Sequence, residues 1–209
     1  MTKPTYIVAS PFKTGTSSIA KALVLLGAGC APMPYRGDVL ADIGPSVQQA
    51  HWLVRPNMSF DAFRARHGDE IRAAFTGLLA VCDGFDIFHD APIGHSHLHP
   101  FILKTLMPRA RLIWVKRPKA GWLESVRKWE VAHPDVYPHH AKWHTDKDDM
   151  VAQKIRRRMV ARRGFAAFRR ACPDDAVVLD WADLGHFDRL ANFCGRKAPD
   201  EPFPHCNRS

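Results

Sequence analysis

A short apolar run, a hydroxyl-rich turn and an amphipathic helix follow one another near the N-terminus, and this succession constrains the fold of the chain more than any other feature. Residues 6–9, Tyr-Ile-Val-Ala, form the apolar run and predict a buried strand. Residues 12–18, Phe-Lys-Thr-Gly-Thr-Ser-Ser, form the turn, and apolar residues at helical spacing follow over residues 19–26. A strand, a tight loop and a helix in this order direct backbone N–H groups and the positive end of a helix dipole toward a phosphate.

The side chains of this turn also suit an anion. Lys13 carries a positive charge, and Gly15 allows the backbone to approach a ligand closely. The hydroxyl donors of the turn are Thr14, Thr16, Ser17 and Ser18. The lysine precedes the glycine, whereas an ATP-binding Walker loop requires Gly-Lys-Ser/Thr, so the turn is not of the ATPase type. The alternative from the residues alone is a hydroxyl-rich cap on an ordinary strand–helix unit.

Alternating strand and helix patterns continue along the chain. Short apolar runs at residues 85–89, 111–115 and 176–179 predict further strands, and helical patterns separate them. This alternation predicts an α/β fold of three layers, with a central, mostly parallel sheet of about four to five strands, helices on both faces and a P-loop-like arrangement. Ligands of such sheets bind beyond the carboxyl ends of the strands.

The chain is expected to form a single domain over residues 1–209, because its length is sufficient for a full core. Residues 28–45 are rich in Gly and Pro and predict a loop, followed by a short helix over residues 46–53. Residues 31–60 would form an insertion that faces the substrate. A long, basic helix is predicted over residues 148–171.

Polar residues follow the second and third predicted strands. His89 ends the second predicted strand and Asp90 follows it, and Arg117 follows the third, with Ser125 eight positions later on the next helix. A planar guanidinium and a hydroxyl group suit a phosphate. The alternative is an arginine in a salt bridge at a strand end and a serine on a helix surface. Because the strand ends of a parallel sheet meet at one edge, these residues should face the same cleft as Lys13.

Three motifs together resemble the sulfotransferases that use 3′-phosphoadenosine 5′-phosphosulfate (PAPS). The turn around Lys13 is similar to their 5′-phosphosulfate loop, Pro-Lys-(Ser/Thr)-Gly-Thr-Thr, with Phe12 in place of the proline. The spacing of Arg117 and Ser125 is similar to their 3′-phosphate motif. Residues 199–204, Pro-Asp-Glu-Pro-Phe-Pro, resemble the ending of one branch of the family.

The resemblance implies an enzyme that moves a sulfuryl group from PAPS to a hydroxyl or amine acceptor and leaves adenosine 3′,5′-bisphosphate (PAP), with no catalytic metal. It implies that Lys13 neutralises the leaving oxygen of the nucleotide. The implied cofactor-binding residues are Lys13, Thr14, Gly15, Thr16, Ser17, Ser18, Arg117 and Ser125. Family members place a catalytic base after the second strand, two positions before a proline. Asp90 occupies that place, and His89 is the neighbouring alternative.

The net charge of +9 implies an anionic partner. We expect the acceptor to be a small molecule or a saccharide, and the expectation includes anionic acceptors. No nucleic acid is expected, because the aromatic residues of the basic helix, Phe165 and Phe168, should face the core. The rival functions are a small-molecule kinase and a non-catalytic protein that binds a nucleotide or a nucleic acid. Magnesium-dependent ATP turnover would favour the first rival, and steeply salt-dependent oligonucleotide binding the second.

Two further patterns complete the sequence-based expectations. No apolar run reaches the roughly 18 to 20 residues that cross a bilayer, and the N-terminus lacks a signal-peptide pattern, so a cytoplasmic protein without a membrane partner is expected. His95, His97 and His99 have a metal-like spacing, but no set of carboxylates or cysteines accompanies them. We therefore expect a solvated loop there and no metal.

Overall fold

The computed structural model describes residues 4–133 and 147–206, and these form a sheet of five parallel strands. The strands are β1 (Thr5–Val8), β2 (Pro32–Met33), β3 (Ile87–Phe88), β4 (Ala110–Lys116) and β5 (Ala176–Asp180). Their order across the sheet is β2-β3-β1-β4-β5, and all four pairings are parallel. The predicted α/β class and the predicted parallel sheet are confirmed.

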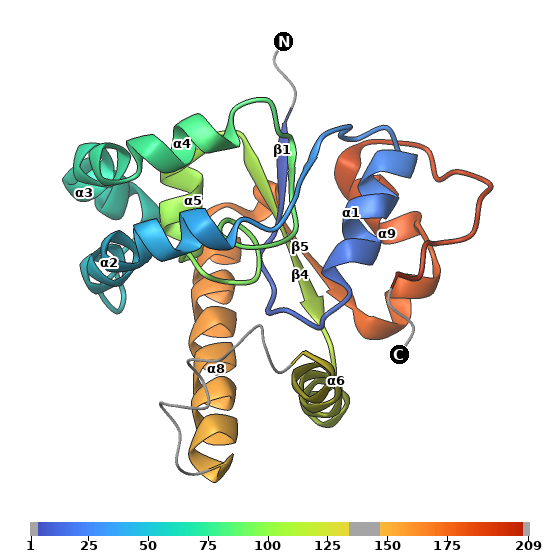
Figure 1. Cartoon of the computed structure of the whole chain (residues 1–209). Coiled ribbons are helices and arrows are strands. Elements are labelled where there is room, and N and C mark those ends of the chain that lie inside the picture. The colour runs from blue at the N-terminus through green and yellow to red at the C-terminus, as the bar shows by residue number, and fades with distance from the viewer. Residues whose placement is uncertain (1–3, 134–146, 207–209) are drawn as a thin grey trace.

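Helices cover both faces of the sheet, which confirms the three layers (Figure 1). Helices α1 and α9 lie on one side, and α2 to α5 lie on the other (Figure 1). The helices are α1 (Thr16–Leu25), α2 (Gly37–Leu53), α3 (Phe60–Ala74), α4 (Thr76–Cys82), α5 (Pro100–Leu106), α6 (Lys119–Ala132), α8 (Lys147–Ala171) and α9 (Asp188–Cys194). Two 3₁₀ turns, η2 (Pro173–Asp175) and η3 (Trp181–Gly185), flank β5.

Alternation along β1 divides the core into two clusters. Ile7 packs with residues of α2, α3, α5 and α8, whereas Tyr6 and Val8 pack with residues of α1 and α9. All three side chains are at most 1% exposed. Burying a large apolar side chain stabilises a fold by roughly 1.5–3 kcal/mol, so a strand apolar on both faces anchors both layers. The loop after β1 is thereby fixed to a rigid base.

Helix α2 departs from the sequence-based expectation. A loop was expected up to Pro45, yet the helix begins at Gly37 and runs through this proline. Proline removes one backbone donor from a helix, which is why it predicted a boundary. Val39, Ile43 and Ala50 recur at helical spacing and are buried in the core cluster on this side of the sheet, so their packing outweighs the lost hydrogen bond.

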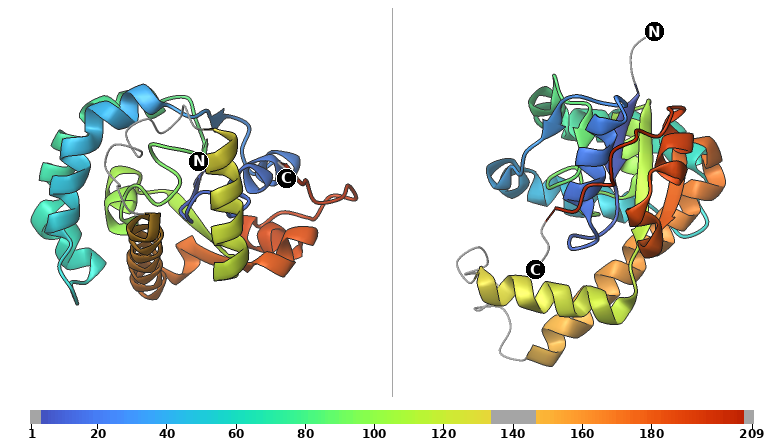
Figure 2. Two further views of the ribbon diagram at one scale, coloured as in Figure 1. Left: turned by 60° about the horizontal axis from the view of Figure 1, so that its bottom comes forward. Right: turned by 90° about the vertical axis from the view of Figure 1, so that its right-hand side faces the viewer.

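Helix α6 and the N-terminal part of α8 project beyond the carboxyl end of β4 (Figures 1 and 2). The predicted long, basic helix is confirmed as α8, and Phe165 and Phe168 pack into the core with exposures of 3% and 0%. The described parts of these two helices lie next to the carboxyl ends of the strands, where ligands of parallel sheets bind. Across residues 4–133 and 147–206, none of the helices has both the length and the apolar character needed to cross a membrane.

Candidate functional site

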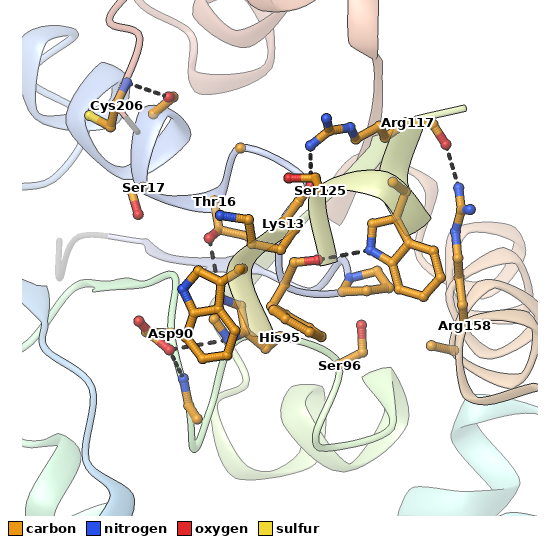
Figure 3. A pocket seen from close by; sticks show the side chains of 18 of the residues that line it. Lys13, Thr16, Ser17, Asp90, His95, Ser96, Arg117, Ser125, Arg158 and Cys206 are labelled. Carbon is orange, nitrogen blue, oxygen red and sulfur yellow. Dashed lines mark hydrogen bonds and ion pairs between the residues drawn. The ribbon is translucent and has the colours of Figure 1, made fainter. Parts of the chain in front are cut away.

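A cleft of about 1200 Å³ opens at the carboxyl ends of the strands. Two loops meet in it (Figure 3). The donor loop, residues 12–18, comprises the end of the connection from β1 to α1 and the first residues of α1, and the histidine segment, residues 89–99, follows β3. Residues of α6, of α8 and of the 3₁₀ turn η3 complete the walls.

Gly15 shapes the donor loop. Its φ of 81° lies in the left-handed region, and a Cβ atom placed on it would approach Leu184 Cδ1 to 3.0 Å. Gly15 is also the N-cap of α1, and none of the described residues caps this helix with a side chain. The first turn of the helix contains no acidic residue. Its N–H groups and its dipole are therefore left to a ligand.

The hydroxyl groups of the donor loop divide into two sets. Thr16, Ser17 and Ser18 line the cleft, and Ser18 Oγ also accepts a hydrogen bond from the Cys206 backbone N–H at 3.0 Å. Thr14 is buried, and its Oγ1 donates to the carbonyl oxygen of Pro11 at 2.6 Å. The structure thus brings three of the four predicted hydroxyls to the cleft. The Thr14 hydroxyl is used within the loop, so Thr14 could contact a ligand only through its backbone.

Two residues that follow β4 hold the donor loop in place. Arg117 donates from Nη1 to the carbonyl oxygen of Lys13 at 2.6 Å, and Trp122 donates from Nε1 to the carbonyl oxygen of Phe12 at 2.9 Å (Figure 3). The Arg117 guanidinium also lies over the Trp181 ring, 4.2 Å from its centroid. Arg117 and Ser125 both line the cleft, as predicted from the sequence.

Positive charges crowd this wall of the cleft. Burial lowers the pKa of Lys13, and the neighbouring Arg117 lowers it further. The pKa of Arg158 is lowered by burial and by the charges of Arg162 and Arg117, while its Nη2 donates to the Arg117 carbonyl oxygen. Cations that disfavour one another's charge gain stability when an anion enters among them. The donor loop and its surroundings therefore form a site for a negatively charged group.

The histidine segment brings Asp90 and His95 into the cleft. His95 Nδ1 lies 3.1 Å from Asp90 Oδ1, and His95 Nε2 lies 3.2 Å from Thr16 Oγ1 (Figure 3). Asp90 also accepts a hydrogen bond from the backbone N–H of Ala91 at 2.8 Å. Sequence analysis selected Asp90 and missed His95, which connects it to the donor loop.

His89, the alternative to Asp90, takes a different position. It is not among the described residues that line the cleft. Its Nδ1 is buried and finds no hydrogen-bond partner among the described residues. Burial lowers the pKa of His89, while the charge of Asp90 raises it. His89 and Asp90, although adjacent in the sequence, therefore lie in different surroundings, and only Asp90 lines the cleft.

The prediction of a solvated loop at His95, His97 and His99 was wrong. All three residues are partly buried, and burial lowers the pKa of His97 and of His99 to about 4. His51 bonds the carbonyl oxygen of His97 at 3.0 Å, and Gly164 of α8 packs closely on His99. Among the residues that the structure describes, His, Cys, Asp and Glu do not gather in any group of three that could hold a metal ion.

The remaining wall of the cleft is aromatic and basic. Tyr35 and Leu40 of the predicted insertion line it, together with Trp129 of α6. Helix α8 contributes Lys154 and Arg157. The Lys154 ammonium pairs with the Glu130 carboxylate. This wall offers flat, apolar surfaces beside cationic groups.

A model of a protein family, described as a sulfotransferase domain, matches residues 6–209 of the chain. All the residues that line the cleft fall within the matched range. A search of curated proteins finds no significant match.

Proposed function

The chain belongs to the sulfotransferase domain family, and on this premise we propose that it moves a sulfuryl group from PAPS to a hydroxyl or amine acceptor. One observation carries the choice of donor. The donor loop presents an uncapped helix N-terminus and Lys13 at a cleft where Arg117 and Ser125 also lie. A donor with two phosphate positions would use both sets of groups, which a simple nucleoside monophosphate would not.

The 5′-phosphosulfate would bind at the donor loop. Backbone N–H groups of residues 15–18 and the hydroxyls of Thr16 and Ser17 supply its donors. The 3′-phosphate would bind Arg117 and Ser125. A guanidinium has five N–H donors, so Arg117 can hold the Lys13 carbonyl oxygen and still bind a phosphate. Arg158, beside Arg117, adds positive charge there.

Sulfuryl transfer places its electrostatic demand on the departing nucleotide. As the bond between sulfur and the bridging oxygen breaks, negative charge grows on that oxygen. Lys13 would stabilise this charge, and its ammonium is already partly desolvated. Because the charge is greatest in the transition state, the lysine would raise the rate more than the affinity. No step in this account requires a metal ion.

The acceptor would occupy the aromatic and basic wall. Tyr35 and Trp129 offer surfaces for a flat ring or for the apolar face of a sugar, and Arg157 favours an anionic substituent, whereas the charge of Lys154 is balanced by Glu130. A small molecule or saccharide fits a cleft of about 1200 Å³ that also holds a nucleotide. Neither nucleic acid nor membrane is required as a partner.

A thermal-shift comparison of PAP, AMP and ATP with magnesium tests the proposal. PAP at about 100 times its dissociation constant should add roughly 2.7 kcal/mol to the free energy of unfolding. AMP at the same concentration should add far less, because it lacks the 3′-phosphate. Equal shifts for PAP and AMP would contradict the proposed donor site. A larger shift with ATP and magnesium, accompanied by ATP turnover, would favour a small-molecule kinase.

A further inference from the structure

Asp90, His95 and Thr16 form a connected line of polar groups within the cleft. His95 Nδ1 faces the Asp90 carboxylate at 3.1 Å, and His95 Nε2 faces the Thr16 hydroxyl at 3.2 Å. Thr16 belongs to the donor loop, so the imidazole ends beside the proposed site of the 5′-phosphosulfate. Figure 3 shows the three side chains beside Lys13.

The backbone around His95 is held in an uncommon conformation. His95 and Ser96 have φ values of 58° and 61°, which residues other than glycine seldom adopt. Ser96 Oγ donates to the carbonyl oxygen of Ala9 at 2.6 Å, which ties the segment to the end of β1. The Gly94 N–H donates to the Asp90 carbonyl oxygen at 2.7 Å, which closes the turn between Asp90 and His95. Strained backbone held by specific bonds is typical of functional sites.

We propose that His95 is the general base that takes the proton from the acceptor, and that Asp90 is the positioning residue that holds the imidazole in its reactive tautomer. The inference rests on the proposed sulfuryl transfer and assigns a role within it. It replaces Asp90 and His89 as candidate bases.

The hydrogen bonds dictate which nitrogen can accept the proton. The Asp90 carboxylate accepts the proton of His95 Nδ1, so Nε2 keeps its lone pair and accepts the Thr16 O–H when no donor is bound. When that O–H turns to the 5′-phosphosulfate, the Nε2 lone pair becomes available to the acceptor. Burial lowers the pKa of His95, His89 lowers it further and Asp90 raises it. The neutral imidazole therefore predominates at neutral pH, which is the form that a base requires.

The step balances when His95 takes the proton. As the acceptor oxygen forms its bond to sulfur, its O–H proton passes to His95 Nε2. The bond between sulfur and the bridging oxygen breaks, and its electron pair stays on that oxygen, which leaves PAP. The imidazolium is stabilised by Asp90 and then releases its proton to water. The products are thus the sulfated acceptor, PAP and a proton released to water.

Asp90 and His89 are less suited to take this proton. The Asp90 oxygen nearest to His95 already accepts bonds from His95 Nδ1 and the Ala91 N–H. These two bonds occupy the lone pairs of that oxygen, so it is not available to the acceptor's proton. His89 stands outside the described lining of the cleft.

The assignment of His95 as the base is tested by the rate at which PAP is released from PAPS. Water, phenol and 4-nitrophenol serve in turn as the acceptor, and PAP is measured by chromatography. His95→Gln should lower turnover with water and with phenol by roughly a hundredfold or more, the range for loss of a general base. The loss should be much smaller with 4-nitrophenol above its own pKa, because that acceptor has already lost its proton. His67→Gln, on α3 and outside the described lining of the cleft, is the matched control and should keep wild-type turnover. Equal losses of His95→Gln with phenol and ionised 4-nitrophenol would overturn the assignment.

The role of Asp90 requires a different measurement. Asp90→Asn should lower turnover and move the acid limb of the pH–rate profile to lower pH, because the charge that raises the pKa of His95 is gone. A merely structural aspartate would lower turnover without moving this limb. Nitrogen NMR of histidine-labelled protein, with His95 assigned by its loss in His95→Gln, should show the proton on Nδ1 in the wild type.

These results separate the inference from the proposed function. A wild-type protein that binds PAP while His95 carries its proton on Nε2 overturns the role of His95 alone. The same holds if His95→Gln releases PAP at the wild-type rate. A wild-type protein that neither binds PAP nor releases it from PAPS overturns the donor, and the role of His95 falls with it.

Discussion

The donor loop and the histidine segment face each other across one cleft but are built differently. The donor loop joins a buried strand to the first turn of the helix that follows it in the sequence, and its glycine, lysine and hydroxyls come from seven consecutive residues. The histidine segment takes its shape from distant residues, through the bonds of Ser96 to Ala9 and of His95 to Thr16. The first loop therefore carries a sequence signature, whereas the second becomes recognisable only in the folded chain.

The largest expected effect tests whether the donor loop acts in the chemistry or only caps a helix. Lys13→Ala should lower sulfuryl transfer by roughly a thousandfold, because the charge is needed most when the bridging oxygen becomes an anion. Binding of PAP should change far less, since the loop N–H groups, Arg117 and Ser125 remain. Turnover and nucleotide affinity measured side by side check this split. Transfer at a near wild-type rate would reduce the loop to a helix cap.

Lys13→Arg refines this comparison. It keeps the charge but replaces a compact ammonium with a planar fork, so only partial rescue of turnover is expected. Full rescue would mean that charge alone matters at this position.

The histidine segment should be the more acid-sensitive of the two loops. Burial lowers the pKa of His97 to about 4, so the unfolded chain binds a proton there between about pH 6.5 and 4 that the folded chain does not. The stability that this site contributes is complete above pH 6.5 and is lost as the pH falls toward 4, by about 3 kcal/mol.

Chemical denaturation at several pH values measures the loss. The free energy of unfolding of His97→Gln should fall less than that of the wild type as the pH is lowered from 6.5 to 4. Parallel curves for the two proteins would show that His97 is not buried in its neutral form.

Sequence reasoning recovered what is locally encoded. The strands β1, β3, β4 and β5, the parallel sheet and the cleft position of Lys13, Arg117 and Ser125 follow from patterns of adjacent residues. The short strand β2 was missed, because it lies within residues 28–45, for which a loop was predicted. It ended a loop at Pro45 because the local cost of proline was visible and the burial of α2 was not. His95 lies 79 positions from Thr16, and their contact depends on how two loops pack at a sheet edge. Such a contact produces no periodic pattern of residues by which the sequence could reveal it.

An intermediate effect concerns the second phosphate position of the donor wall. Ser125→Ala should weaken PAP binding by about 2 kcal/mol, the contribution of a hydrogen bond to a charged group, and should leave AMP binding unchanged. Isothermal titration of both nucleotides provides the measurement and its control. Unchanged affinity for PAP would remove Ser125 from the site. An equal loss for AMP would place Ser125 at the 5′-phosphate instead.

The smallest effect asks how far the donor loop, too, depends on distant contacts. Trp122 is 2% exposed and donates from Nε1 to the Phe12 carbonyl oxygen, 110 positions away. Trp122→Phe keeps an aromatic ring but loses this donor, which should lower the free energy of unfolding by about 1 kcal/mol. Trp52→Phe is the matched control, because Trp52 is 68% exposed and should tolerate the change.

If the loop also loses its shape, PAP affinity should fall in Trp122→Phe beyond what the stability loss explains, since N–H groups that no longer converge bind a phosphate less well. Denaturation curves and PAP titrations of both variants check this. If stability falls and PAP affinity does not, the loop holds its shape through Gly15 and the strand–helix junction alone. The donor loop would then differ from the histidine segment in its local construction as well as in its sequence signature.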